Sequence, residues 1–288
     1  MDETGRRKAI ALYDRFTHEG LERRQFMAEM TRLAGGAAAA NLLIGSIAAS
    51  PAAAAVVAED DKRLTTSTRR FLGGSYGAYV AGPRSGAARS TVMVIHENRG
   101  LNAHIKDIAR RLALAGHMAV APDFLSPSGG TPADEDTART AIGKLDLSAA
   151  TDSGVALLDA LSGRKGGNGK VGAIGFCWGG AYVNRLAVAA GSKLDAGVVF
   201  YGTAPAAAEA ARVRAPLMIH LAGLDQRVNQ TAFPWVSALR AAGRKVSFHL
   251  YDGVNHAFNN DTSAERFDRA AAEMAWRRTL IFLRRHLA

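Results

Sequence analysis

Short apolar runs and amphipathic stretches alternate along residues 90–287, and their spacing predicts strands followed by helices. Runs rich in apolar and β-branched residues predict strands at 90–97, 117–124, 170–176, 196–202, 216–223 and 245–253. Helical periodicity predicts helices at 102–116, 131–145, 147–162, 177–191, 234–243 and 263–287. This alternation indicates an α/β fold, in which a mostly parallel central sheet carries helices on both faces.

Turn and capping signals place several boundaries of these elements. The segment FLGGSYGAYVAGP at 71–83 predicts a small antiparallel hairpin ahead of the alternating region. Asn102 is expected to cap the helix at 102–116, because its side chain can accept from a free backbone N–H. Thr131–Pro132 is expected to open the helix at 131–145.

The last helix is expected to be amphipathic, with Phe267, Met274 and Ile281 on its apolar stripe. No internal repeat or low-complexity linker interrupts the pattern after residue 58. Residues 59–288 are therefore predicted to form a single domain.

Residues 1–58 have a different character. The basic segment ERRQFM at 22–27 precedes an alanine-rich apolar run from Leu33 to Ala55, which is the order found in export signals. The pair Arg23–Arg24 followed by Phe26 resembles a twin-arginine signal. We expect cleavage within 54–59 and a periplasmic or secreted mature protein without stable membrane insertion; the alternative is a disordered or helical extension on a cytoplasmic protein.

Composition narrows the possible partners. The chain of 288 residues carries a formal net charge of +10, which favours anionic partners. Its arginines are scattered and form no basic stripe interleaved with aromatic residues, so nucleic acid binding is not expected. A single cysteine excludes an intrachain disulfide and a cysteine-rich metal site.

The only cysteine lies in GFCWGG at 175–180, between a predicted strand and a predicted helix. The frame G-x-C-x-G has the form of the nucleophile elbow G-x-S-x-G, with Cys177 in place of serine. The backbone N–H of Trp178 would then point at a developing oxyanion, and the helix N-terminus would favour a thiolate. The alternative is that Cys177 packs as a small buried hydrophobic residue.

A nucleophile needs a base, and the base needs an acid that orients it. Asp225 and His256 each follow a predicted strand, so both should lie on the same sheet edge as Cys177, in the order nucleophile, acid, histidine. Asp252, in a predicted turn, is the alternative acid. The other histidines considered fall within predicted strands or on an early helix: His220, His249 and His104.

The loop HENRGLN at 96–102 follows an early strand, where a second oxyanion donor is expected. The backbone N–H of Asn98 is the candidate donor. Glu97 could contact the resting thiol or take its proton; the alternative is a loop carboxylate paired with Arg99.

The motifs HENRGLN, GFCWGG, GLDQRVN and NHAFNN, in this order, resemble those of the dienelactone hydrolase family over residues 71–287. The resemblance implies an α/β-hydrolase fold and a triad of Cys177, Asp225 and His256. It also implies a contact between Glu97 and the resting cysteine, and a reaction that needs no cofactor and no metal. The family enzyme opens an unsaturated lactone that bears a carboxylate.

One departure concerns the substrate. The family uses arginines to hold the substrate carboxylate, and one of them lies four residues after the histidine, where this chain has Asn260. Arg139 and Arg99 are the alternative cations. We expect a small anionic lactone or ester as substrate, with a weaker preference for carboxylate-bearing lactones, and a monomer or weak oligomer. A non-catalytic binding domain and a thiol redox sensor remain alternatives, although a sensor would lack a resolving cysteine.

Overall fold

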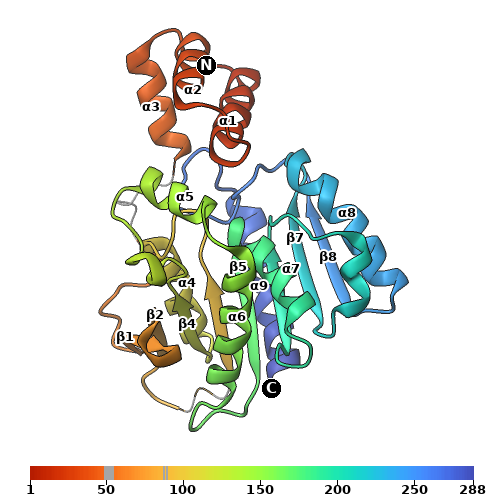
Figure 1. Ribbon diagram of the computed structural model, residues 1–288. Coiled ribbons are helices and arrows are strands. Elements are labelled where there is room, and N and C mark those ends of the chain that lie inside the picture. Colours follow the sequence, from red (N-terminus) through yellow and green to blue (C-terminus); the bar gives the residue numbers. More distant parts are fainter. Residues whose placement is uncertain (49–54, 87, 89) are drawn as a thin grey trace.

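The computed structural model describes residues 1–288 except 49–54, 87 and 89 (Figure 1). Its centre is an eight-stranded sheet of order β1-β2-β4-β3-β5-β6-β7-β8. The strands are β1 (Leu64–Phe71), β2 (Tyr76–Pro83), β3 (Thr91–Ile95), β4 (Met118–Pro122), β5 (Val171–Phe176), β6 (Ala196–Phe200), β7 (Leu217–Ala222) and β8 (Val246–Tyr251). Strands β3 to β8 are parallel, and β2 pairs antiparallel with both β1 and β4.

Helices cover both faces of the sheet, as predicted. They are α4 (Ala103–Leu114), α5 (Glu135–Gly143), α6 (Leu147–Ser162), α7 (Trp178–Ala189), α8 (Gln226–Ala241) and α9 (Arg269–Leu287). Buried side chains of α6, α7 and α8 share one apolar cluster, and those of α4 and α9 share another. The mostly parallel sheet with helices on both faces is therefore confirmed.

Two helices begin at residues other than those predicted, because an aspartate side chain caps the first turn of each. The helix expected from Thr131 begins at Glu135, with Asp134 as its N-cap, while Thr131 hydrogen-bonds Asp123. The helix expected from residue 234 begins at Gln226, because the side chain of Asp225 caps it. By contrast, Asn102 caps α4 as predicted, accepting from the N–H of Ile105 at 3.2 Å.

The apolar stripe predicted for α9 was also wrong. Phe267 precedes the helix, and Met274 and Ile281 are 39 % and 62 % exposed. Small side chains on the opposite face let the helix approach the sheet closely, and larger ones fill the space at its end. The face that packs inward includes Ala271, Ala275, Phe282 and Leu283.

The first 47 residues form three helices that lie together beyond the carboxyl edge of the parallel strands (Figure 1). They are α1 (Glu3–His18), α2 (Arg23–Ala34) and α3 (Ala37–Ile47), called the N-terminal cap below. They share a small core of their own, which includes Ile10, Tyr13, Phe26, Met30 and Ile47. The turn at Gly35–Gly36 divides the apolar run that suggested an export signal.

The export prediction itself is not tested by this arrangement. The first position of the expected cleavage window, residue 54, lies outside the described residues. Among the residues that the structure describes, we find no helix with the length and apolar character needed to span a bilayer.

Candidate active site

Cys177 stands at a sharp turn between β5 and α7. Its backbone has φ 55° and ψ −114°, a conformation that typically costs about 1–3 kcal/mol outside glycine. The glycines on either side make the turn possible. A Cβ on Gly175 would lie 2.0 Å from the carbonyl oxygen of Gly179, and one on Gly179 would lie 2.4 Å from that of Ile95. The glycines of the G-x-C-x-G frame are therefore required sterically, and the turn that they permit holds the thiol of Cys177 at the edge of the sheet.

Asp225 and His256 meet at the same edge. Oδ2 of Asp225 lies 2.5 Å from Nδ1 of His256, and its Oδ1 accepts from the N–H of Val228 at 3.1 Å. A ring nitrogen of His256 and the sulfur of Cys177 lie within 4.8 Å of one another. All three side chains are buried, whereas the alternative acid, Asp252, is exposed in the turn after β8. The geometry therefore favours Asp225 as the partner of the histidine.

The environment favours a charged pair. Burial works against the imidazolium form, but the charges of Asp225 and Cys177 outweigh it and raise the pKa of His256 to about 10. Burial also works against the carboxylate of Asp225, yet the charge and hydrogen bond of His256 hold the pKa of Asp225 below its ordinary value. The structure thus holds His256 as an imidazolium, paired with the Asp225 carboxylate and next to the sulfur of Cys177.

Glu97 lies in the loop after β3 and is buried. Its Oε2 accepts from Nδ2 of Asn260 at 2.9 Å, and no described residue hydrogen-bonds to its Oε1. The residue that stands in place of the family's arginine therefore holds this carboxylate. Glu97 is not paired with Arg99, which instead pairs with Glu135 and donates to the hydroxyl of Tyr13.

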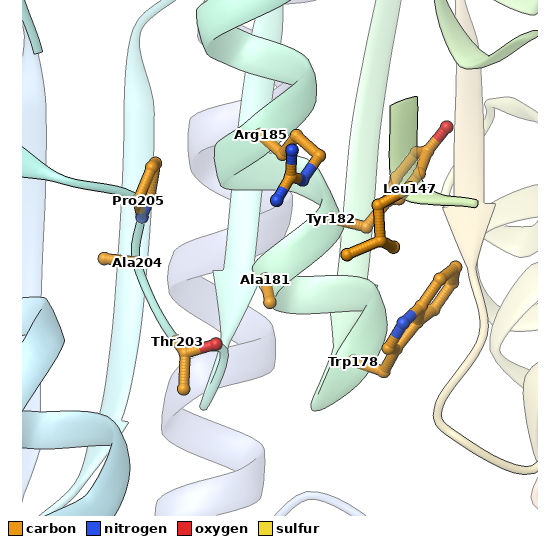
Figure 2. A pocket seen from close by; sticks show the side chains of 8 residues that line it. All are labelled: Leu147, Trp178, Ala181, Tyr182, Arg185, Thr203, Ala204 and Pro205. Atoms are coloured by element: carbon orange, nitrogen blue, oxygen red, sulfur yellow. The ribbon is translucent and has the colours of Figure 1, made fainter. Parts of the chain in front are cut away.

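Two cavities adjoin at the nucleophile. One, of about 250 Å³, is lined by Cys177, Asn98, Arg139 and Arg227, among others. The other, of about 210 Å³, shares Trp178, Ala181 and Thr203 with the first. Figure 2 shows its walls: Leu147, Trp178, Tyr182 and Arg185 on one side, and the loop from Thr203 to Pro205 on the other. A substrate could therefore extend from the thiol in two directions.

The cations of the first cavity differ from those expected. Arg139 lines it, but its guanidinium lies 3.3 Å from Asp136 and 4.1 Å from the ring of Phe16. Sequence reasoning missed Arg227, which follows Asp225 by two positions in GLDQRVN. Within the described part of the chain, Arg227 has no hydrogen-bonded or ion-paired partner. It is therefore a cation available to a ligand.

The N-terminal cap closes over this edge of the sheet. Nε2 of His18, at the end of α1, lies 4.0 Å from the sulfur of Cys177, and the side-chain amide of Asn98 donates to the carbonyl of Thr17 at 3.3 Å. Arg266 fixes the far end of the cap, because its Nε donates to the carbonyl of Ile47 at 3.1 Å. Neither His18 nor Arg266 belongs to a motif, so no sequence signal marked them.

The three histidines weighed against His256 lie in strands or on an early helix, as predicted. His220 is buried in β7, where its ring nitrogens lie 3.0 Å from the hydroxyl of Tyr251 and 3.1 Å from that of Thr279. His249 lies on β8, and His104 lies on α4, 3.3 Å from Asp261. His256 is thus the catalytic candidate among them.

Comparison with known proteins shows which family and fold the chain resembles. The dienelactone hydrolase family model matches residues 76–287. A carboxymethylenebutenolidase homologue of Escherichia coli O157:H7 is 31 % identical over 225 residues, covering 73 % of this chain and 82 % of that protein. The crystal structure of a dienelactone hydrolase homologue from Klebsiella pneumoniae has a TM-score of 0.70 at 25 % identity, covering 77 % of this chain and 98 % of that one.

A solved esterase, rPPE, resembles nearly the whole chain. It has a TM-score of 0.63 at 14 % identity and covers 99 % of this chain and 98 % of that one, which shows the fold alone. The sheet and its helices thus form an α/β-hydrolase fold, whereas the N-terminal cap lies outside the family match.

Proposed function

Because the chain belongs to the dienelactone hydrolase family and is a hydrolase of the lactone and ester type, we propose that it acts through a triad of Cys177, His256 and Asp225. The observation that carries this proposal is the alignment of the three groups. The carboxylate lies 2.5 Å from one ring nitrogen of His256, and the ring lies within 4.8 Å of the only thiol.

The proposed reaction has two halves. The thiolate of Cys177 attacks the carbonyl carbon, the carbon–oxygen bond to the leaving group breaks, and the departing alkoxide takes the proton of His256. Water then attacks the thioester while His256 removes its proton, and the thiolate leaves to restore the enzyme. Asp225 keeps the proton-carrying Nδ1 of the ring turned toward itself in both halves.

Two backbone donors are proposed to hold the oxyanion. The N–H of Trp178 is the first in α7 and has no partner within the helix. The N–H of Asn98 comes from the loop after β3, which lines the same cavity. Donors fixed in place before the reaction stabilise the charge that develops on the carbonyl oxygen.

We propose an anionic substrate whose carboxylate lies toward Arg227. That side chain lines the nucleophile cavity without a protein partner, while Arg99 and Arg139 are both engaged. The adjoining cavity, with Leu147, Trp178 and Pro205 in its walls, suits the apolar part of the substrate. Asn260 is committed to Glu97 and supplies no charge to the substrate.

The test is hydrolysis of a short panel of lactones and esters by the purified chain. Cys177→Ala should lower kcat/KM by about a thousandfold or more. Rapid quenching of the wild type should reveal a covalent acyl adduct on Cys177 by mass spectrometry. His249→Ala, outside the site, should retain the kcat/KM of the wild type. Retention of most activity in Cys177→Ala would contradict the triad, and no hydrolysis of any substrate would favour a binding domain.

Export through the twin-arginine route is a separate proposal. It rests on the order of charges and apolar residues before residue 58. In the folded chain, Arg23 forms an ion pair with Asp136 at 2.5 Å, so the pair Arg23→Lys and Arg24→Lys keeps the charge while removing the motif. The double variant should stay in the cytoplasm. An intact Met1 on protein from its native cell would refute the export proposal.

A further inference from the structure

Three side chains with nitrogen or sulfur donors converge where the N-terminal cap meets the nucleophile. The donor atoms of His18, Cys177 and His256 all lie within 4.8 Å of one another. The sulfur of Cys177 is 4.0 Å from Nε2 of His18, and the two imidazole rings meet edge to face, with centroids 4.8 Å apart. His18 comes from α1, so this cluster exists only while the cap is docked.

The cluster has unused bonding capacity. Nδ1 of His256 is occupied by Asp225, and its Nε2 is buried with no hydrogen-bond partner among the described residues. The His256 side chain as a whole is 3 % exposed. A cavity of about 20 Å³ lies beside the three residues, and Glu97, whose Oε1 is also buried and unpartnered, lines it. That volume accommodates a single small atom or ion.

We propose that His18, Cys177 and His256 form a binding site for a divalent transition metal, with Zn²⁺ as the ion of best fit. Thiolate and imidazole are the ligands that zinc prefers, and a three-ligand site keeps a fourth position for water or for Oε1 of Glu97. Tetrahedral zinc with such ligands places the donor atoms about 3.3–3.6 Å apart. The three donor atoms lie within 4.8 Å of one another, so metal binding requires them to close by up to about 1 Å.

The surroundings of the cluster support a metal. A carboxylate on the outer nitrogen of a ligating histidine fixes the ring and raises its basicity, and Asp225 occupies that place on His256. Nδ1 of His18 lies 3.5 Å from the side-chain nitrogen of Asn98, so Nε2 is the ring nitrogen that faces the thiol.

The metal would oppose hydrolysis. It would occupy the sulfur and the ring nitrogen that the proposed reaction needs, and its binding would displace the proton shared by Cys177 and His256. The site is therefore an inhibitory one and differs from a cofactor site, in keeping with a reaction that needs no metal. Because His18 belongs to the N-terminal cap, the metal would also fasten the cap over the substrate cavities.

The experiment uses the full-length protein, freed of metal by dialysis against a chelator. Zn²⁺ affinity is measured by competition with a chromophoric chelator, and Co²⁺ is added as a spectroscopic probe. We expect one ion per chain, a thiolate-to-cobalt charge-transfer band, and visible bands of tetrahedral cobalt. His18→Asn should weaken binding by about a hundredfold, since loss of even an outer-sphere partner typically costs 10–100-fold. His249→Asn is the matched control and should bind as the wild type does.

Alkylation of Cys177 with iodoacetamide provides a test without substitution and should abolish the cobalt band. The proposal is overturned if the wild type binds no Zn²⁺ or Co²⁺, if the cobalt spectrum lacks a thiolate band, or if His18→Asn binds as tightly as the wild type. Hydrolysis is measured separately in the presence of chelator. Failure of the metal site therefore leaves the proposed triad intact, and loss of the triad would show in that second assay.

Discussion

Replacement of Asp225 by asparagine tests the electrostatic core of the site. The substitution keeps the shape of the side chain and an oxygen for the N–H of Val228, but removes the charge that lies 2.5 Å from Nδ1 of His256. With that charge present, the pKa of His256 is raised from 6.5 to about 10. This rise corresponds to roughly 5 kcal/mol in favour of the imidazolium, because one pKa unit equals about 1.36 kcal/mol.

Only part of that free energy comes from Asp225, because Cys177 also contributes and burial opposes both. Assigning about half of it to the carboxylate predicts a loss of about 2–3 kcal/mol, or roughly a hundredfold in the population of the imidazolium–thiolate pair. Reaction with iodoacetamide reports this population directly, since Cys177 is the only thiol in the chain.

The assay follows alkylation by mass spectrometry from about pH 5 to about pH 9, a range that brackets the ordinary titration of histidine and cysteine. Chelator is present throughout. At the acidic end Asp225→Asn should react about a hundredfold more slowly than the wild type, and the difference should shrink toward alkaline pH. Asp252→Asn removes the exposed rival acid and should match the wild type. Equal pH profiles for Asp225→Asn and wild type would refute the reasoning.

Three further outcomes are expected. Gly175→Ala should lower the free energy of urea unfolding by more than about 3 kcal/mol, because its Cβ would lie 2.0 Å from a backbone oxygen. The control Gly143→Ala, which has open space around the new Cβ, should be neutral or stabilising, and equal effects of the two substitutions would contradict the steric argument. Arg227→Met should lower kcat/KM for a carboxylate-bearing substrate about 5- to 100-fold relative to a neutral ester, because the cation that faces the substrate is lost. Arg240→Met, at an exposed position of the same helix, should leave that ratio unchanged. An unchanged ratio in Arg227→Met would contradict the assignment of this cation. Because the pKa of His256 is raised, its contribution to stability should be complete below pH 6.5 and disappear toward about pH 10, which urea unfolding across that range would detect as a falling free energy.

The sequence was sufficient to predict where the three groups of the proposed triad meet. Cys177, Asp225 and His256 each follow a parallel strand, and the carboxyl ends of parallel strands share one edge of a sheet. Once the strands are identified, residues that directly follow them can therefore be expected to lie close together. The same argument placed Glu97 and Asn98 after β3 at that edge.

The sequence could not predict which residues contact the long side chains of Arg99 and Arg139. Arg99 and Arg139 were correctly expected near the site, but an arginine reaches several ångströms, and its partner depends on packing. Both lie against the N-terminal cap, through Tyr13 for Arg99 and Phe16 for Arg139. The N-terminal cap carries no catalytic or substrate-binding motif, so no sequence signal predicted that it would engage these cations. The apolar stripe predicted for α9 was wrong because small alanine side chains, and none of the three larger residues chosen, form much of the face that packs on the sheet.

The N-terminal cap connects the export proposal to the chemistry of the site. If residues up to the window at 54–59 are removed on export, the mature chain loses His18, and with it one ligand of the proposed metal site. The aromatic and backbone partners of Arg139 on α1 leave at the same time, so that Asp136 would remain as its ion-pair partner and the guanidinium would be more accessible to a substrate carboxylate. The full-length chain would then be closed and sensitive to metal, and the shortened chain open and insensitive. Protein isolated from the native cell with an intact Met1 should therefore be inhibited by Zn²⁺. Protein whose N-terminus lies within 54–59 should be insensitive to Zn²⁺.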